Sequence, residues 1–288
     1  LCFRITVTGG ILGDSGGDIH LGRGNANKIL NRFLYQMMTT YQEDFHLYEF
    51  NGGNLRNAIP REASAVFSVP EHYKHDLRPA LNVFTAEIEN ELHRVEPDLN
   101  ILLETEPHRD WSIDSSTSYR LITSLYGCPH GVYAMSQDIP GLVETSTNLA
   151  SVKMKPENTI RIETSQRSSI LSSRDDIATT VRAVFRLAGA QVNWGEGYPG
   201  WKPNPDSEIL KVAEESYKRL FGVDAKVKAI HAGLECGLFL DKYPALDMIS
   251  FGPTLTGVHS PDERMHIPSV DKFWKHLLDV LAHIPAKN

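Results

Sequence analysis

Apolar and polar residues nearly alternate in the stretch Cys2–Thr8 at the start of the chain, and this pattern predicts a β-strand. The clearest helix is predicted over residues 73–95, where seven apolar side chains recur every three or four positions and form one face. Pro79 lies within this stripe, so we expect a kink or a later helix start. The other elements expected before residue 195 are helices at 23–38 and 174–188 and strands at 45–50, 63–69, 99–103, 149–154, 159–164 and 190–194.

Strand–helix–strand runs therefore occur twice before residue 195, and they predict a duplicated α+β sandwich. The segment Trp194–Pro205 is dense in glycine and proline, which marks a domain boundary. The elements expected beyond it are typical of part of an α/β layer: a helix capped by Asp206 or Ser207 that ends near Phe221, strands at 227–231 and 246–251, and a helix at 270–284. We therefore expect two domains, residues 1–195 and residues 196–288.

The composition is that of a globular protein, with 41% hydrophobic and 23% charged residues. A net charge of −7, with lysine and arginine spread along the chain, argues against a nucleic-acid partner. No apolar run approaches the roughly 20 residues of a membrane span. The three cysteines, Cys2, Cys128 and Cys236, are widely spaced and predict reduced thiols in a cytosol-like compartment. The first residues resemble neither a signal peptide nor a transit peptide and look like a strand entered partway, so we expect the chain to be part of something longer.

One short motif, Gly13–Gly17, matches the sequence around the nucleophile of chymotrypsin-like serine proteases. A serine followed by glycines can present its hydroxyl and nearby N–H groups to a carbonyl. That family places its histidine and aspartate before the serine, and only fourteen residues precede Ser15. We therefore interpret the motif as a glycine-rich turn from a strand to a helix.

Four longer segments, with a short fifth one at Tyr198–Trp201, carry a more specific signal. They are Ser15–Lys28 (SGGDIHLGRGNANK), Gly52–Ala63 (GGNLRNAIPREA), Ile230–Phe239 (IHAGLECGLF) and Gly252–Glu263 (GPTLTGVHSPDE). In order and spacing they are similar to segments of the Xaa-His dipeptidases, also called aminoacylhistidine dipeptidases or peptidase D. One such segment would be a weak signal, but four in register span essentially the whole chain.

The resemblance implies a carnosinase-like zinc-exopeptidase domain with a lid inserted into it. Residues 1–195 would be the lid and dimerisation domain, and residues 196–288 the C-terminal segment of the catalytic domain. The family members are cytosolic homodimers that use two zinc ions to hydrolyse unblocked dipeptides, preferentially those with C-terminal histidine. Their other metal ligands and their general-base glutamate precede the lid. This sequence does not contain that segment, so we expect the chain alone to be inactive.

Site residues are carried over from the resemblance position by position. His259 matches a zinc ligand, and Arg167 matches the residue that binds the C-terminal carboxylate of the dipeptide, which suits a guanidinium fork. Asn57 matches an amide that orients the substrate, and Gly233 matches a point of close backbone approach to it. Without the resemblance, these residues would be interpreted as a loop histidine, a solvated arginine and an asparagine in a turn.

Asp14 departs from the family pattern, which has histidine at this position. The resemblance implies that this histidine reaches a zinc site, usually across a dimer interface, and donates a hydrogen bond to the scissile carbonyl. An ionised aspartate accepts instead, and losing one such donor typically costs roughly 10²–10³ in rate. His20 lies six residues farther on, and we expect it on the far side of the turn. His231 and Glu235 belong either to the pocket or to the support of their loop.

A second hypothesis comes from another functional class. The chain could be a non-catalytic dimerisation and ligand-binding module, or a pseudoenzyme. Asp14 and the missing metal-binding segment both favour this alternative. Zinc-dependent hydrolysis of an Xaa-His dipeptide distinguishes the two.

Overall fold

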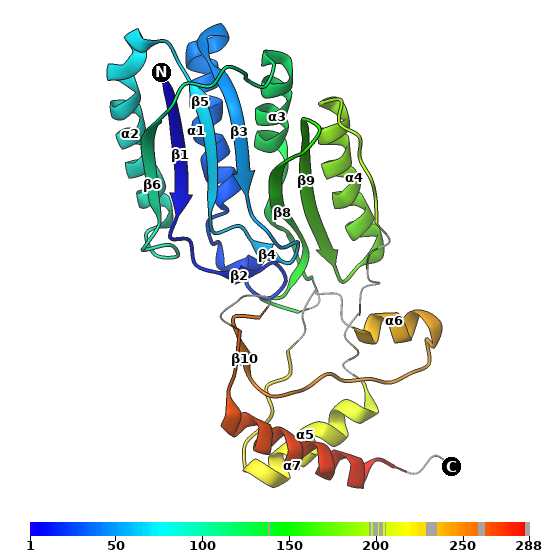
Figure 1. The fold of residues 1–288 in the computed structure, drawn as a ribbon. Helices are drawn as coiled ribbons and strands as arrows, with labels where there is room; N and C mark the ends of the chain where they lie inside the picture. The colour runs from blue at the N-terminus through cyan, green and yellow to red at the C-terminus, as the bar shows by residue number, and fades with distance from the viewer. Residues whose placement is uncertain are drawn as a thin grey trace.

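The computed structural model describes residues 1–285 apart from 138, 196, 198–200, 202–203, 205, 229–234 and 259–262. In this part of the chain, seven strands form one antiparallel sheet in the order β6-β1-β5-β3-β8-β7, and β9 also pairs with β8 (Figure 1). The strands are β1 (Cys2–Thr8), β3 (His46–Gly52), β5 (Ala63–Ser68), β6 (Asn100–Glu106), β7 (Gly131–Met135), β8 (Val143–Lys155) and β9 (Thr159–Ser168). The expected mixture of helices and strands is confirmed.

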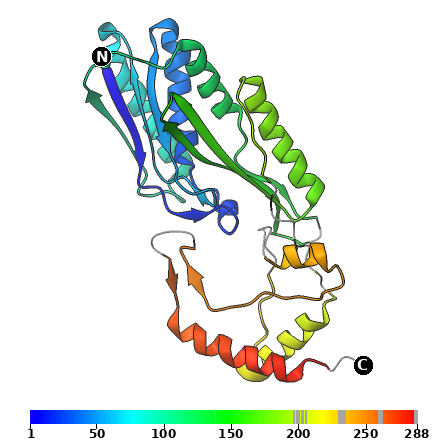
Figure 2. The same cartoon turned by 45° about the vertical axis from the view of Figure 1, so that its right-hand side comes forward.

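Four helices lie against one face of this sheet, and their apolar sides form the core with it (Figure 2). They are α1 (Ala26–Tyr41), α2 (Lys74–Leu92), α3 (Ser115–Gly127) and α4 (Leu171–Leu187). The ring of Phe33 on α1 is fully buried, and its centroid lies 6.3 Å from that of Phe67 and 5.3 Å from that of Phe84. Helix α2 contains Pro79 and begins directly after the 3₁₀ turn Glu71–Tyr73, so the predicted apolar stripe does form one helix.

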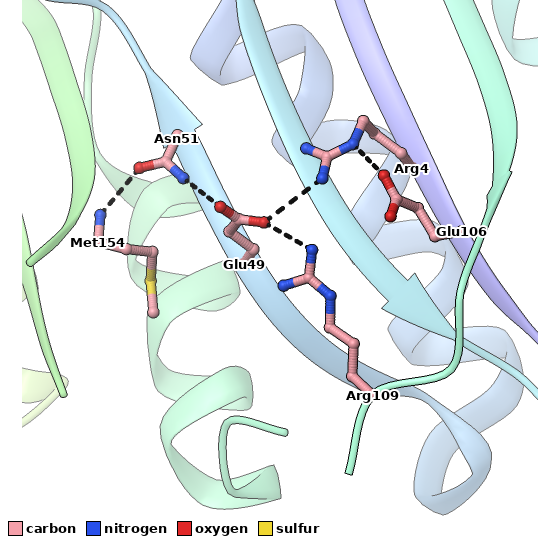
Figure 3. A network of polar contacts seen from close by, with 6 residues as sticks. All are labelled: Arg4, Glu49, Asn51, Glu106, Arg109 and Met154. Atoms are coloured by element: carbon pink, nitrogen blue, oxygen red, sulfur yellow. Dashed lines mark hydrogen bonds and ion pairs between the residues drawn. The ribbon is translucent and has the colours of Figure 1, made fainter. Parts of the chain in front are cut away.

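The opposite face of the sheet carries polar side chains instead of a second apolar layer. Figure 3 shows a network across it, made by Arg4, Glu49, Asn51, Glu106, Arg109 and the backbone of Met154. Glu49 is its centre, because one carboxylate oxygen lies 3.1 Å from Arg109 Nη2 and 3.7 Å from Arg4 Nη2. The network joins strands β1, β3 and β6 to the segment that leads into α3.

The order of the elements supports the predicted duplication. The first half runs β1-α1-β3-β5-α2-β6, and the second half repeats its central part as α3-β8-β9-α4, with β7 added. The two halves share one sheet because Gly52 of β3 pairs with Val152 of β8. The helix α3 (Ser115–Gly127) and the strand β7 were not predicted, because both segments are short and their apolar residues follow no regular spacing in the sequence.

Two predicted strands are wrong. Residues 190–194 form no strand, because α4 ends at Leu187, the chain turns at Gly189 (φ +75°), and the Trp194 ring then lies 4.7 Å from the Arg182 guanidinium on that same helix. Residues 246–251 also form none. Phe251 packs instead against Phe273 and His276 of the last helix, with ring centroids 5.6 Å and 4.8 Å apart. Both segments have strand-like side chains, but their side chains pack on helices.

The C-terminal elements lie below the sheet in Figure 1. They are α5 (Glu208–Phe221), α6 (Glu235–Lys242), β10 (Leu255–Thr256), β11 (Arg264–Met265) and α7 (Ile267–His283). Ser207 caps α5 as predicted, because its hydroxyl accepts a hydrogen bond from the backbone N–H of Leu210 at 3.1 Å. Helices α5 and α7 pack together, with Ala213 and Val280 buried between them.

Two expectations from composition can be compared with the structure. All three cysteines are free thiols in the structure, and Cys2 and Cys128 are buried. Among the described helices, none combines the length and the apolar character that a membrane crossing requires.

Candidate functional site

A small second sheet lies at the lower end of the main sheet in Figure 1, on the side of the C-terminal elements. It consists of β2 (Gly13–Asp14) and β4 (Ala58–Ile59), which pair antiparallel with Asp14 opposite Ala58. The backbone N–H of Ser15 donates to the carbonyl of Asn57 at 2.8 Å, which extends the pairing. Two of the family-like segments, far apart in sequence, are therefore joined here.

Asp14 has a definite structural role in this turn. Its Oδ1 accepts hydrogen bonds from the backbone N–H groups of Gly16 at 2.7 Å and Gly17 at 2.6 Å. Its own N–H donates to the carboxylate of Asp18 at 3.0 Å. A carboxylate next to free N–H groups commonly stabilises such a turn. Asp14 therefore acts as an acceptor at the position where the family pattern has a donor.

Arg167 comes to the same place from strand β9. Its Nη2 lies 3.4 Å from the hydroxyl oxygen of Ser15, a side chain that is 1% exposed. Its Nε is buried and has no hydrogen-bond partner among the described residues. Burial lowers the pKa of the Arg167 guanidinium; the Asp14 carboxylate opposes this change, and Arg56 adds to it. A partly desolvated guanidinium with an unused donor is suited to bind a carboxylate.

Two buried residues that no sequence motif identified hold these segments in place. Glu96 is 3% exposed, and its carboxylate accepts from the backbone N–H of Ile11 at 2.7 Å and of Gly24 at 2.9 Å. It therefore fastens both ends of the segment that carries Asp14. Asn148 of β8 is 1% exposed and donates to backbone carbonyls on either side of Asn57. Both act on backbone groups, which no side-chain motif reveals.

The remaining predicted site residues are distributed as follows. His259, Gly233 and His231 lie outside the described residues. Glu235 begins α6, but its side chain is not described. His20 lies in the 3₁₀ turn Ile19–Leu21 and is exposed.

A metal site was also tested against the structure. Within the described residues, no three histidine, cysteine, aspartate or glutamate side chains lie close enough together to hold a metal ion. A structural or catalytic zinc needs three or four protein ligands. The described residues therefore do not by themselves fit a zinc ion.

The comparisons with known proteins agree with one another. Residues 5–96 match the family model of a peptidase dimerisation domain. The chain is 41% identical over 285 residues to the cytosol non-specific dipeptidase of Escherichia coli K12, a match that covers 99% of this chain and 58% of that protein. It also matches the crystal structure of aminoacylhistidine dipeptidase from Vibrio alginolyticus with a TM-score of 0.84 and 40% identity, over all of this chain and 58% of that one. The chain thus spans little more than half the length of either relative. It belongs to the peptidase M20 family.

Proposed function

We propose that this chain carries the substrate-binding part of a metal-dependent dipeptidase that prefers Xaa-His dipeptides. One observation supports this most strongly. Arg167, with a buried and unused Nε donor, lies beside Ser15 and the turn of Asn57, so three distant segments meet at one cationic point. The two long relatives are both dipeptidases by name.

In this proposal, Arg167 binds the C-terminal carboxylate of the dipeptide through charge-assisted hydrogen bonds. Asn57 would help to fix the same carboxylate end and so orient the substrate through its amide, which offers both a donor and an acceptor. Gly233 would give the substrate room to approach the backbone. Water is then added across the peptide bond, which releases the two amino acids.

The metal part of the proposal rests on the family alone. We assign His259 as a ligand of one of two zinc ions. The other ligands would come from the part of the relatives that this chain does not cover. Residues 1–195 would form the lid and dimerisation domain of a cytoplasmic homodimer. Residues 196–288 would complete a catalytic domain.

A non-catalytic ligand-binding module is the second candidate, and Asp14 favours it. Its Oδ1 already accepts two backbone hydrogen bonds, so the carboxylate is held as an acceptor. Such a group would oppose negative charge that develops on a scissile carbonyl. A module of this kind would bind dipeptides without cleaving them.

The test is hydrolysis of β-alanyl-histidine by a chimera in which this chain is joined to the part of the E. coli relative that it does not match. Measured with added zinc, the chimera should hydrolyse the dipeptide. Asp14→His should raise the rate by about 10²-fold or more, because it restores a donor. Asp14→Asn keeps the acceptor for Gly16 and Gly17 and adds a donor, so it should also raise the rate.

The exposed Asp44→His serves as the matched control and should leave the rate unchanged. A chimera that binds β-alanyl-histidine but stays inactive in all three variants would favour the non-catalytic module. A chimera that neither binds nor cleaves the dipeptide would overturn the proposal.

A further inference from the structure

We propose that Asn148 is a positioning residue that sets the spacing between Asn57 and Arg167. This inference deepens the proposed function and rests on it, because the spacing matters for a substrate that contacts both residues. Asn148 would not touch the substrate itself. It would act through the backbone of the turn that carries Asn57.

The first argument is the position of Asn148 in the sheet. In the antiparallel pairing of β8 with β9, Asn148 lies opposite Ser165 and Ser146 lies opposite Arg167. Asn148 and Arg167 are therefore diagonal neighbours on one face of the sheet, a relation in which Cα atoms lie about 7–8 Å apart. The irregularity in this pairing falls beyond them, between Leu149 and Ser151. The backbone at both residues is thus regular.

The second argument is what the Asn148 side chain holds. Its Nδ2 donates to the carbonyl of Ala58 at 2.8 Å and lies 3.4 Å from the carbonyl of Arg56. These carbonyls belong to the residues immediately before and after Asn57. The carbonyl of Asn57 itself accepts from the backbone N–H of Ser15. All three carbonyls of the turn are therefore fixed, while the Asn57 side chain is left half-buried and available.

The third argument is that little else ties this turn to β8. Strand β4 has two residues and pairs only with β2. The turn approaches β8 closely at Gly53, where a Cβ atom would lie 1.9 Å from the carbonyl oxygen of Ala150. Farther along the turn, the amide of Asn148 links the two through the carbonyls of Ala58 and Arg56. Its Oδ1 is buried without a hydrogen-bond partner among the described residues, so the donor side of the amide is the half in use.

The test uses the 288-residue chain and two variants. Asn148→Asp removes the donor and sets a negative charge against two carbonyls, and Asn148→Ser keeps one donor on a shorter side chain. The Ser15 amide should exchange with solvent at least tenfold faster in both variants, measured by NMR, because Asn57 moves. The amides of Leu30 and Phe33 in α1 should keep their rates. Asn90→Asp, an exposed residue of α2, is the control and should change none of them.

A second measurement separates positioning from general damage to the site. NMR titrations with β-alanyl-histidine and with β-alanyl-histamine, which lacks the carboxylate, give the two dissociation constants. The carboxylate of the dipeptide would contact both Asn57 and Arg167, whereas β-alanyl-histamine makes neither contact. Substitution of Asn148 should weaken dipeptide binding at least tenfold and change β-alanyl-histamine binding less than twofold.

Equal weakening of both ligands would mean a merely structural role and would overturn the inference. An unchanged Ser15 exchange rate in the folded variants would overturn it as well. If the unsubstituted chain binds the dipeptide no better than β-alanyl-histamine, the proposed function fails. The exchange rates then still decide whether Asn148 holds the turn.

Discussion

The sheet unit, Cys2–Leu187, and the C-terminal segment, the described residues from 206 to 285, bury their apolar side chains very differently. In the sheet unit, Phe33, Phe67 and Phe84 are at most 1% exposed. In the described C-terminal segment, Ala213 and Val280 are the buried hydrophobic residues, while Trp274 is 55% exposed and Ile267 is 78% exposed. An apolar pattern forms a core only where a second layer exists to cover it.

The helices of the C-terminal segment illustrate this dependence. Both α5 and α7 are amphipathic, and they cover one another along Ala213, His276 and Val280. Several other apolar side chains of α7 stay exposed among the described residues: Ile267, Trp274, Leu278 and Leu281.

The largest expected effect contrasts the two regions directly. Phe33→Ala leaves a cavity among three phenylalanine rings, so the free energy of unfolding should fall by about 3–5 kcal/mol. Trp274→Ala removes a side chain that is already more than half exposed, and the change should stay within about 0.5 kcal/mol. Urea unfolding followed by circular dichroism measures both. Similar losses in the two variants would contradict the contrast.

The next effect sharpens the description of the sheet unit through pH. His130 Nδ1 lies 3.3 Å from Asn25 Nδ2 and 3.4 Å from the backbone N of Leu149. Both neighbours are N–H donors, so this nitrogen must accept and the ring must be neutral. Burial, and then the charge of Lys28, lower the pKa of His130 from 6.5 to about 4.

The unfolded chain takes up a proton on His130 below pH 6.5, whereas the folded chain resists this down to about pH 4. The free energy of unfolding should therefore fall by about 3 kcal/mol as the pH drops through that window. His130→Asn keeps a hydrogen-bond acceptor but has no group that titrates in this pH range. The free energy of unfolding of this variant should therefore lose this part of its pH dependence. Urea unfolding at pH 7.5, 6 and 5 tests this, with exposed His75→Asn as the control. A pH dependence that is equal in wild type and His130→Asn would contradict the assignment.

The sequence predicted most of the sheet unit because its pattern and its packing agree there. Residues 73–95 are an example, because Leu77, Phe84 and Ile88 belong to the predicted apolar stripe and are all buried in α2. The prediction failed at 190–194 and 246–251, where strand-like side chains pack on helices. Periodicity describes which face is apolar, and it does not say which neighbour will cover that face.

The candidate site was predictable to a different degree. Motifs identified Asp14, Asn57 and Arg167, and the fold brings their segments together. Motifs could not identify Glu96 or Asn148, because these residues hold backbone groups whose position depends on the folded chain. His259 and Gly233 lie outside the described residues and stay predictions.

The smallest and most direct test concerns Arg167 itself. Isothermal titration of the 288-residue chain with β-alanyl-histidine gives the dissociation constant for wild type and for Arg167→Met. Loss of one charge-assisted contact should weaken binding by about tenfold or more, while Arg186→Met, an exposed arginine of α4, should bind like wild type. Equal dissociation constants for wild type and Arg167→Met, or no binding by wild type, would contradict the account.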